Sequence, residues 1–169
     1  PEQAAPLVAS SSHLATEVAQ VRMQPCWAVM ASFAAGTEVP FAGAFVSDSP
    51  LSWIACNSSK PGRCATPETW VLHASRDWST EHLELPAEEV ATQLCAALRR
   101  AWPDGKWEPT SALAHRWRYA IPQNPLAQPA FYDAEIGLGI GGDWCGGPRV
   151  EGAALSGWAL ADAVMPLSQ

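Results

Sequence analysis

The sequence has few charged residues and no long apolar run, and each absence excludes a class of protein. Only 16% of the 169 residues are charged while 48% are hydrophobic, which excludes a largely disordered chain. No apolar run approaches the ~18 to 20 residues that a membrane-spanning helix needs. No charged segment followed by an apolar stretch opens the chain, so no secretory signal is expected. We therefore expect one globular domain with no membrane partner.

Positive charge is scarce as well. Ten lysines and arginines stand against 17 aspartates and glutamates, which gives a net charge of −7. A protein that binds the phosphate backbone of a nucleic acid needs the opposite sign, so we expect no nucleic-acid partner.

The cysteines and histidines lack the spacing of a disulfide framework or a metal site. The cysteine count is five, there is no C-x-x-C pair, and the four histidines show no metal-ligand spacing, so no metal is expected. Free thiols indicate a reducing, cytoplasmic compartment. Cys26 and Cys95 lie in apolar stretches and are expected to be small buried residues.

Tryptophan, in contrast, is abundant. The chain has nine tryptophans against two tyrosines and four phenylalanines. Indole rings in such numbers build either a thick aromatic core or walls around a flat ligand. Composition leaves both interpretations open.

The spacing of apolar residues predicts a mixture of strands and helices. Strands are expected in short apolar or β-rich runs bounded by Ser, Pro and Gly, namely residues 27–33, 44–46, 53–56, 69–73, 107–119 and 134–141. Helical spacing is found in residues 1–24, 87–100 and 149–164. The clearest helix follows Pro86: Val90 and Leu94 share one face, and Arg99 and Arg100 suit its carboxyl end. Ser11 or Ser12 can cap the first helix. The first strands are expected to form an antiparallel meander.

Residues 137–142 match the pattern G-x-G-x-x-G, but their context argues against a dinucleotide site. That pattern requires glycines that follow a strand and open directly into a helix. Here the glycines lie inside the expected strand, and residues 143–148 separate them from the helix, so we reject the dinucleotide interpretation. The helix itself contains Gly152 and Gly157, each of which costs about 1 kcal/mol relative to alanine. They indicate either close approach of a flat ligand or packing against a sheet.

Residues 142–162 resemble the carboxy-terminal flavin-binding motif of FAD-dependent amine-oxidase-like enzymes, specifically the renalase-like branch of these flavoprotein oxidoreductases. Upstream segments resemble the same branch in the same order, namely residues 24–30, 45–55, 57–63, 70–74 and 115–120. The resemblance covers most of the chain from Gln24 onward. With the strand pattern, it predicts an α+β fold: a mixed, mainly antiparallel sheet with helices, plus the terminal strand and helix of an FAD-binding α/β domain.

The resemblance also implies a division of the chain. Residues 1–133 would form a substrate-binding domain that is incomplete at its amino terminus, and residues 134–169 the strand–turn–helix of the FAD-binding domain. Nothing matches the amino-terminal Rossmann-type unit, so the chain looks like the carboxy-terminal part of a larger enzyme. By itself it is expected to bind FAD poorly and to be inactive. An unpaired terminal strand makes self-association a further expectation.

For the cofactor, the resemblance implies a short set of residues around the Gly-rich turn, namely Gly142, Asp143, Trp144, Arg149, Val150 and Glu151. Asp143 would accept hydrogen bonds from the ribityl hydroxyls of FAD, or else only stabilise the turn. Backbone N–H groups of Arg149, Val150 and Glu151 would face the pyrimidine edge of the flavin, where a helix amino terminus stabilises negative charge. The side chain of Glu151 should point away.

Substrate-binding candidates lie in the middle strands and the loop after them, namely Trp53, Asn57, Lys60, His73 and Trp117. For the aromatic residues, core packing is the alternative. Arg116 and Arg118 share one face, which is either solvated or binds an anion. Where the family has an arginine, this chain has Cys56, which argues against an anion contact there.

The reaction that the resemblance implies is oxidation of a dihydronicotinamide isomer by O2, giving H2O2. The substrate would be a dihydronicotinamide dinucleotide, with an amine as the alternative substrate of the same chemistry. Because the flavin carries the redox chemistry, no nucleophile or acid–base pair is expected. A different class also fits: a non-catalytic, acidic module that binds a small ligand or a protein through a tryptophan-rich sheet.

Overall fold

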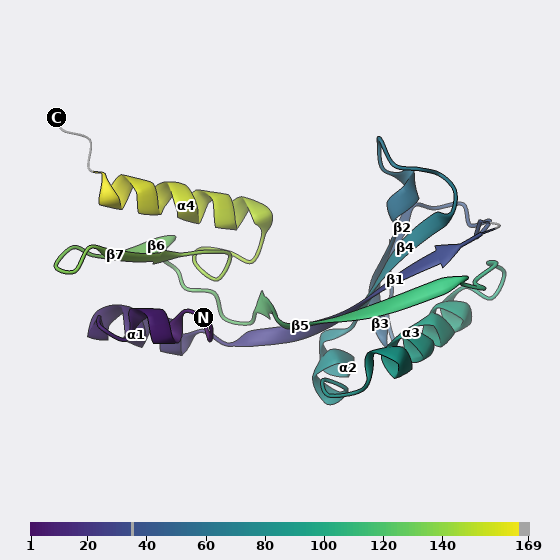
Figure 1. The fold of residues 1–169 in the computed structure, drawn as a ribbon, viewed down its shortest axis with the longest axis horizontal. Helices are drawn as coiled ribbons and strands as arrows, with labels where there is room; N and C mark the ends of the chain where they lie inside the picture. The colour runs from purple at the N-terminus through teal and green to yellow at the C-terminus, as the bar shows by residue number, and fades with distance from the viewer. Residues whose placement is uncertain (35, 166–169) are drawn as a thin grey trace. The chain divides into compact units, whose positions relative to one another are not determined.

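A computed structural model describes residues 1–34 and 36–165, and the chain forms two compact units (Figure 1). The sheet unit is Pro25–Arg118, and the terminal unit combines Pro1–Gln24 with Tyr119–Gln169. The predicted division between residues 133 and 134 concerns the domains of a longer enzyme and stays a prediction.

Five strands form the sheet of the sheet unit in the order β2-β3-β4-β1-β5. Their bounds are β1 Met23–Phe33, β2 Gly43–Phe45, β3 Leu51–Cys56, β4 Glu68–Ala74 and β5 Ser111–Pro122. The expected antiparallel meander is confirmed for β2, β3 and β4. It is wrong for β1, which pairs antiparallel with β4 rather than with β2. The predicted fold class, α+β with a mainly antiparallel sheet, is confirmed.

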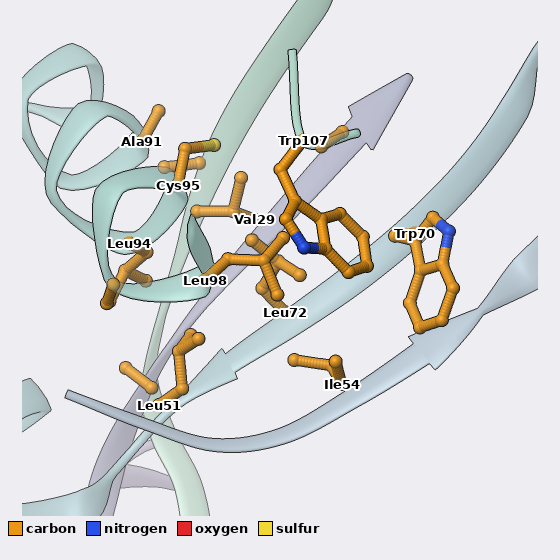
Figure 2. Packing of buried hydrophobic residues seen from close by; sticks show 14 of the residues in the cluster. Val29, Leu51, Ile54, Trp70, Leu72, Ala91, Leu94, Cys95, Leu98 and Trp107 are labelled. Atoms are coloured by element: carbon orange, nitrogen blue, oxygen red, sulfur yellow. The ribbon is translucent and has the colours of Figure 1, made fainter. Parts of the chain in front are cut away.

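Helix α3 (Ala87–Ala101) packs against one face of this sheet. Its apolar stripe is fully buried at Val90, Leu94 and Leu98, as the spacing predicted. Figure 2 shows Leu94 and Leu98 of the helix together with Val29, Ile54 and other strand residues of the same core, and the indole rings of Trp70 and Trp107. The short helix α2 (Arg76–Glu81) precedes α3, and Ser75 caps it by accepting a hydrogen bond from the backbone N–H of Trp78.

The carboxylate of Glu68 lies beside the core tryptophan Trp70. Glu68 accepts hydrogen bonds from the hydroxyl of Thr37 and from the indole N–H of Trp70, both at 2.5 Å, and from the backbone N–H of Thr37 at 3.3 Å. Thr37 and Trp70 are each 1% exposed. Burial by itself would raise the pKa of Glu68, but these hydrogen bonds outweigh it and hold the pKa below its ordinary 4.5.

Replacing Glu68 by alanine should lower the free energy of unfolding by about 1 to 3 kcal/mol, because two buried donors lose their acceptor. Since the folded pKa is depressed, the carboxylate stabilises the fold above pH 4.5 and this contribution is lost as the pH falls through the folded pKa. Urea unfolding at pH 7 and pH 3 measures both effects. Glu135→Gln, at an exposed position, is the control; equal losses for Glu135→Gln and Glu68→Ala would contradict the assignment.

The terminal unit is a β-hairpin with a helix on each side (Figure 1). Its elements are η1 Ala5–Val8, α1 Ser12–Gln20, β6 Ala130–Asp133, β7 Leu138–Gly141 and α4 Val150–Val164. Ser11 is the residue that caps α1, through the backbone N–H of Leu14, and its hydroxyl also donates to Asp133 at 2.5 Å. Apolar residues of α1 and of the hairpin form the small core of this unit.

Several boundaries differ from those predicted. The strand expected over residues 134–141 begins only at Leu138, because the residues before it form the turn of the β6–β7 hairpin. The strand expected from residue 107 begins at Ser111. Cys95 is buried as expected, whereas Cys26 is only partly buried. All five cysteines lie within the described residues and are unpaired.

Within residues 1–34 and 36–165, no helix has the length and apolar character to cross a membrane. In the same ranges the hairpin sheet has two strands. Self-association through its free edge stays a prediction.

Candidate functional site

The first candidate site is the turn between β7 and α4, which is fixed by one serine. Ser156 is completely buried, and its hydroxyl accepts a hydrogen bond of 2.8 Å from the backbone N–H of Gly142. A Cβ at Gly141 would lie 2.6 Å from the same hydroxyl oxygen. The glycines of β7 therefore let α4 approach the hairpin closely, which is the packing interpretation of this segment.

The two helix glycines behave differently. A Cβ at Gly152 would lie 2.2 Å from the carbonyl oxygen of Gly147, so the start of α4 needs glycine there. A Cβ at Gly157 would meet no atom within 4 Å. Close packing within the chain thus explains Gly152 and leaves Gly157 without a structural reason in this chain.

The structure brings the predicted cofactor residues together around this turn. Asp143 is partly buried, and within the described part of the chain no hydrogen bond or ion pair occupies its carboxylate. Trp144 is 8% exposed and belongs to the small core, so it packs rather than forming an open wall. Arg149 is the N-cap of α4 without a side-chain cap, and Val150 and Glu151 are exposed.

These features fit the flavin of FAD. The first N–H groups of a helix have no partner inside it, and no side chain among residues 1–34 and 36–165 caps those of α4. The carboxylate of Asp143, which can accept hydrogen bonds from hydroxyl groups, lies at the preceding turn. Next to it, burial raises the pKa of the Cys145 thiol to about 11, so this cysteine is protonated at neutral pH and is no nucleophile.

The second candidate site is the face of the five-stranded sheet opposite α3, which we call the open face. Strand alternation puts Trp53, His73 and Trp117 on it. The registers set Phe45 opposite Trp53, and Trp53 opposite His73. The rings of Phe45 and Trp53 lie 4.6 Å apart, and the indole of Trp53 passes within 3.1 Å of where a Cβ on Gly43 would be.

A hollow of about 490 Å³ lies on the open face and is mainly apolar. Its lining comes from three strands and comprises Ala28, Met30, Val71, His73, Leu113, Ala114, His115 and Trp117. Trp117 is 56% exposed, so it is no core residue, and it packs edge-on against His115 at 4.6 Å. Burial lowers the pKa of His73 below its ordinary 6.5.

The remaining substrate candidates lie elsewhere. Asn57 begins the short helix η2 (Asn57–Ser59), and Lys60, its C-cap, is exposed; neither lines the hollow. Sequence reasoning missed Met30, Val71 and Leu113. Strand alternation would have found them, because residues an even number of positions apart on one strand share a face. Met30, Val71 and Leu113 stand in this relation to Ala28, His73 and Trp117, respectively.

The two arginines of β5 are paired within the chain. Arg116 donates to Glu84 at 2.6 Å and Arg118 donates to the same carboxylate at 2.7 Å. Arg116 also lies over the ring of Trp27, 5.8 Å from its centroid. The hydrogen bonds from Arg118 and Arg116 lower the pKa of Glu84. Because Glu84 binds both guanidinium groups on a partly exposed face, the arginines are not a free anion site.

Among the described residues, no three His, Cys, Asp or Glu side chains gather where they could hold a metal ion.

No family model matches the chain. Its fold is similar to part of a solved structure, a protein assigned as a protoporphyrinogen oxidase from Exiguobacterium sp. 255-15, with a TM-score of 0.57 and 16% sequence identity. The match covers 70% of this chain and 28% of the Exiguobacterium protein. Two structures of putrescine oxidase match with a TM-score of 0.39 and 18% identity over 54% of this chain and 21% of theirs. The chain thus spans just over a quarter of the first of these proteins, with which it shares a fold.

Proposed function

We propose that this chain is the carboxy-terminal part of an FAD-dependent oxidoreductase resembling renalase. The observation that carries the proposal is the fold, which is similar to part of an oxidase over 70% of this chain. The order of the flavoenzyme-like segments in the sequence supports it. So does the arrangement of an unpaired carboxylate and an uncapped helix at one turn, because these groups suit a flavin.

In this proposal the terminal unit holds the cofactor. FAD, when bound, supplies the acceptor for a hydride. Asp143 accepts hydrogen bonds from ribityl hydroxyls, and the backbone N–H groups of Val150 and Glu151 stabilise negative charge. The N–H of Arg149, predicted to do the same, already donates to the carbonyl oxygen of Gly147 at 2.9 Å. Gly142 keeps the turn in place through Ser156.

In the same proposal the sheet unit binds the substrate on its open face, with Trp53, His73 and Trp117 as contacts. Asn57 and Lys60 would reach only a distant part of a dinucleotide, because neither lines the hollow. The net reaction converts a dihydronicotinamide isomer, one proton and O2 into the oxidised nicotinamide and H2O2. Oxidation of an amine is the alternative for the same cofactor.

Asp143→Ala should weaken FAD binding by about 10- to 100-fold, since hydrogen bonds to a charged group contribute about 1.5 to 3 kcal/mol. The measurement uses the longest natural polypeptide that contains this chain and follows FAD retention by absorbance. Asp162→Ala, an exposed aspartate near the end of α4, removes the same charge as a control and should leave FAD binding unchanged.

Peroxide production by that polypeptide with 2- and 6-dihydronicotinamide isomers, compared with amines, tests the reaction. Peroxide production with amines alone would show that the substrate is an amine rather than a dihydronicotinamide isomer. A polypeptide that binds no flavin and oxidises neither substrate would overturn the enzyme proposal in favour of a binding module.

A further inference from the structure

Two loops of the sheet unit enclose a pocket of about 460 Å³, which we call the loop pocket. One loop, residues 38–41, lies between β1 and β2, and the other, residues 101–105, lies between α3 and β5. Lys106 ties the two loops together. Its backbone N–H donates to the carbonyl oxygen of Thr37 at 3.0 Å, and its ammonium group donates to the carboxylate of Glu38 at 2.5 Å. The chain's own contacts therefore set the walls of the pocket.

Two aromatic rings line the loop pocket. Phe41 and Trp102 are both partly buried, with ring centroids 5.3 Å apart and ring planes inclined at 48°. Behind them, Phe41 meets the core residue Trp70 edge-on at 5.9 Å, and the backbone carbonyl of Trp102 accepts a hydrogen bond of 2.9 Å from the indole N–H of Trp107. The rings are thus anchored on the core while part of each remains accessible.

Trp102 also offers a free hydrogen-bond donor. Within residues 1–34 and 36–165 its indole N–H has no acceptor, whereas the N–H of the neighbouring Trp107 has one. In the same ranges, the one buried side-chain nitrogen or oxygen without a partner is Oε1 of Gln24. The N–H of Trp102 is therefore open to solvent and can donate to a ligand.

The charge around the loop pocket is negative. Its lining includes the exposed carboxylates of Glu38 and Asp104 and no lysine or arginine. Glu38 is already paired with Lys106, but no hydrogen bond or ion pair occupies Asp104 in the described part of the chain. An unpaired carboxylate beside aromatic rings favours a ligand that carries a positive charge.

Rings, donor and carboxylate together suit a proline-rich peptide. A polyproline II segment has no internal hydrogen bonds, so its carbonyl oxygens are free to accept one from an indole N–H. Its proline rings pack on aromatic side chains, and its preformed shape keeps the entropy cost of binding low. A small cation could contact the rings and the carboxylate of Asp104, but it has no acceptor for the N–H of Trp102.

We propose that the loop pocket binds a proline-rich segment of a partner protein that carries a basic residue beside its prolines. Phe41 and Trp102 contact the proline rings, the indole N–H of Trp102 donates to a backbone carbonyl of the partner, and Asp104 pairs with the basic side chain. The interaction uses neither the turn around Gly142 nor the open face, so it goes beyond the proposed enzyme function.

Fluorescence anisotropy of labelled peptides, titrated with the 169-residue chain at pH 7, tests the proposal. The probe is one arginine followed by six prolines, about two turns of polyproline II. Replacing its arginine by glutamate should weaken binding at least about threefold, and this difference should shrink at about 1 M NaCl, where charges are screened. Replacing its prolines by glycines should weaken binding at least about tenfold, because the rings and the preformed shape are lost.

Variants assign the binding to the loop pocket. Trp102→Phe keeps a ring but removes the donor, and should weaken binding of the arginine peptide about three- to tenfold. Its missing NMR signal also identifies the indole N–H of Trp102, which should shift when the unaltered chain is titrated. Asp104→Asn, at an exposed position that tolerates change even if Trp102→Phe fails to fold, should weaken binding about two- to fivefold. Asp77→Asn removes the same charge at an exposed position of α2 and should leave binding unchanged.

Equal affinity for the arginine and glutamate peptides would overturn the proposal, as would no binding of the arginine peptide. Binding that neither Trp102→Phe nor Asp104→Asn alters would place the peptide elsewhere and overturn it too. If arginine amide alone binds as tightly as the peptide, the loop pocket is a site for small cations instead. None of these measurements involves FAD or a substrate, so failure here is separate from failure of the proposed flavoenzyme function.

Discussion

Alanine in place of Trp70 is expected to lower the free energy of unfolding by about 3 to 5 kcal/mol, the range found for large aromatic residues in cores. Trp70 is 1% exposed and meets Phe41 and Trp107 edge-on, with ring centroids 5.9 and 5.3 Å away. Its indole N–H also donates to Glu68. Removing the ring therefore leaves a cavity and deprives a carboxylate of a donor.

Urea unfolding of the variant, followed by far-ultraviolet circular dichroism, measures this loss. Trp117→Ala is the matched control, because the same side chain is removed from a position that is 56% exposed, and its cost should stay below about 1 kcal/mol. Similar losses at both positions would show that the open face is a second packed layer rather than a surface for a ligand.

The contrast between these two tryptophans shows what the sequence could predict. Alternation within a strand assigns residues to two faces. It predicts that Trp70 and His73 lie on different faces of the sheet, and that Trp117 and Arg116 do so too. Which face α3 covers is decided by tertiary packing, and strand alternation is the same for either choice. The nine indoles could therefore not be divided between core and ligand wall beforehand.

The helix α3 and the short apolar strands were predictable because each has a strong local signal. Val90, Leu94 and Leu98 repeat at helical spacing, and acids and arginines mark the two ends. In contrast, α2 has only six residues, which is too short for a periodic pattern. Strand β6 follows a proline-rich stretch, and its partner β7 is rich in glycine, so pairing between them rather than local propensity fixes the hairpin.

Of the two candidate sites, the turn around Gly142 could be predicted from the sequence, whereas the hollow could not. The order of residues around Gly142 and Asp143 follows from consecutive sequence, so their proximity was expected. The hollow, in contrast, combines three strands that the chain visits in a different order, since β1 lies between β4 and β5. Met30 and Leu113 join His73 there only because of that order, which no local pattern encodes.

After Trp70, the second large loss of stability is expected at one of the two glycines of α4. Gly152→Ala should lower the free energy of unfolding by about 1 to 3 kcal/mol, as overpacked sites do, because the new Cβ would lie 2.2 Å from a backbone oxygen of Gly147. Backbone atoms cannot rotate away, so either the first turn of α4 or the preceding turn must move. Urea unfolding measures the loss, and faster hydrogen exchange at Ala153, which donates to Arg149 across that turn, locates it.

Gly157→Ala is the matched partner of that change, on the same helix and with the same added methyl group. A Cβ there meets nothing within 4 Å, so the variant should be more stable by up to about 1 kcal/mol through helix propensity alone. A loss of stability at Gly157 as large as at Gly152 would contradict the packing explanation. If the proposed FAD site is correct, Gly152→Ala should also weaken FAD retention by the longer polypeptide, since it displaces the amides of Val150 and Glu151. If Gly157→Ala weakens retention while leaving stability intact, Gly157 is the glycine that gives the flat ligand its close approach.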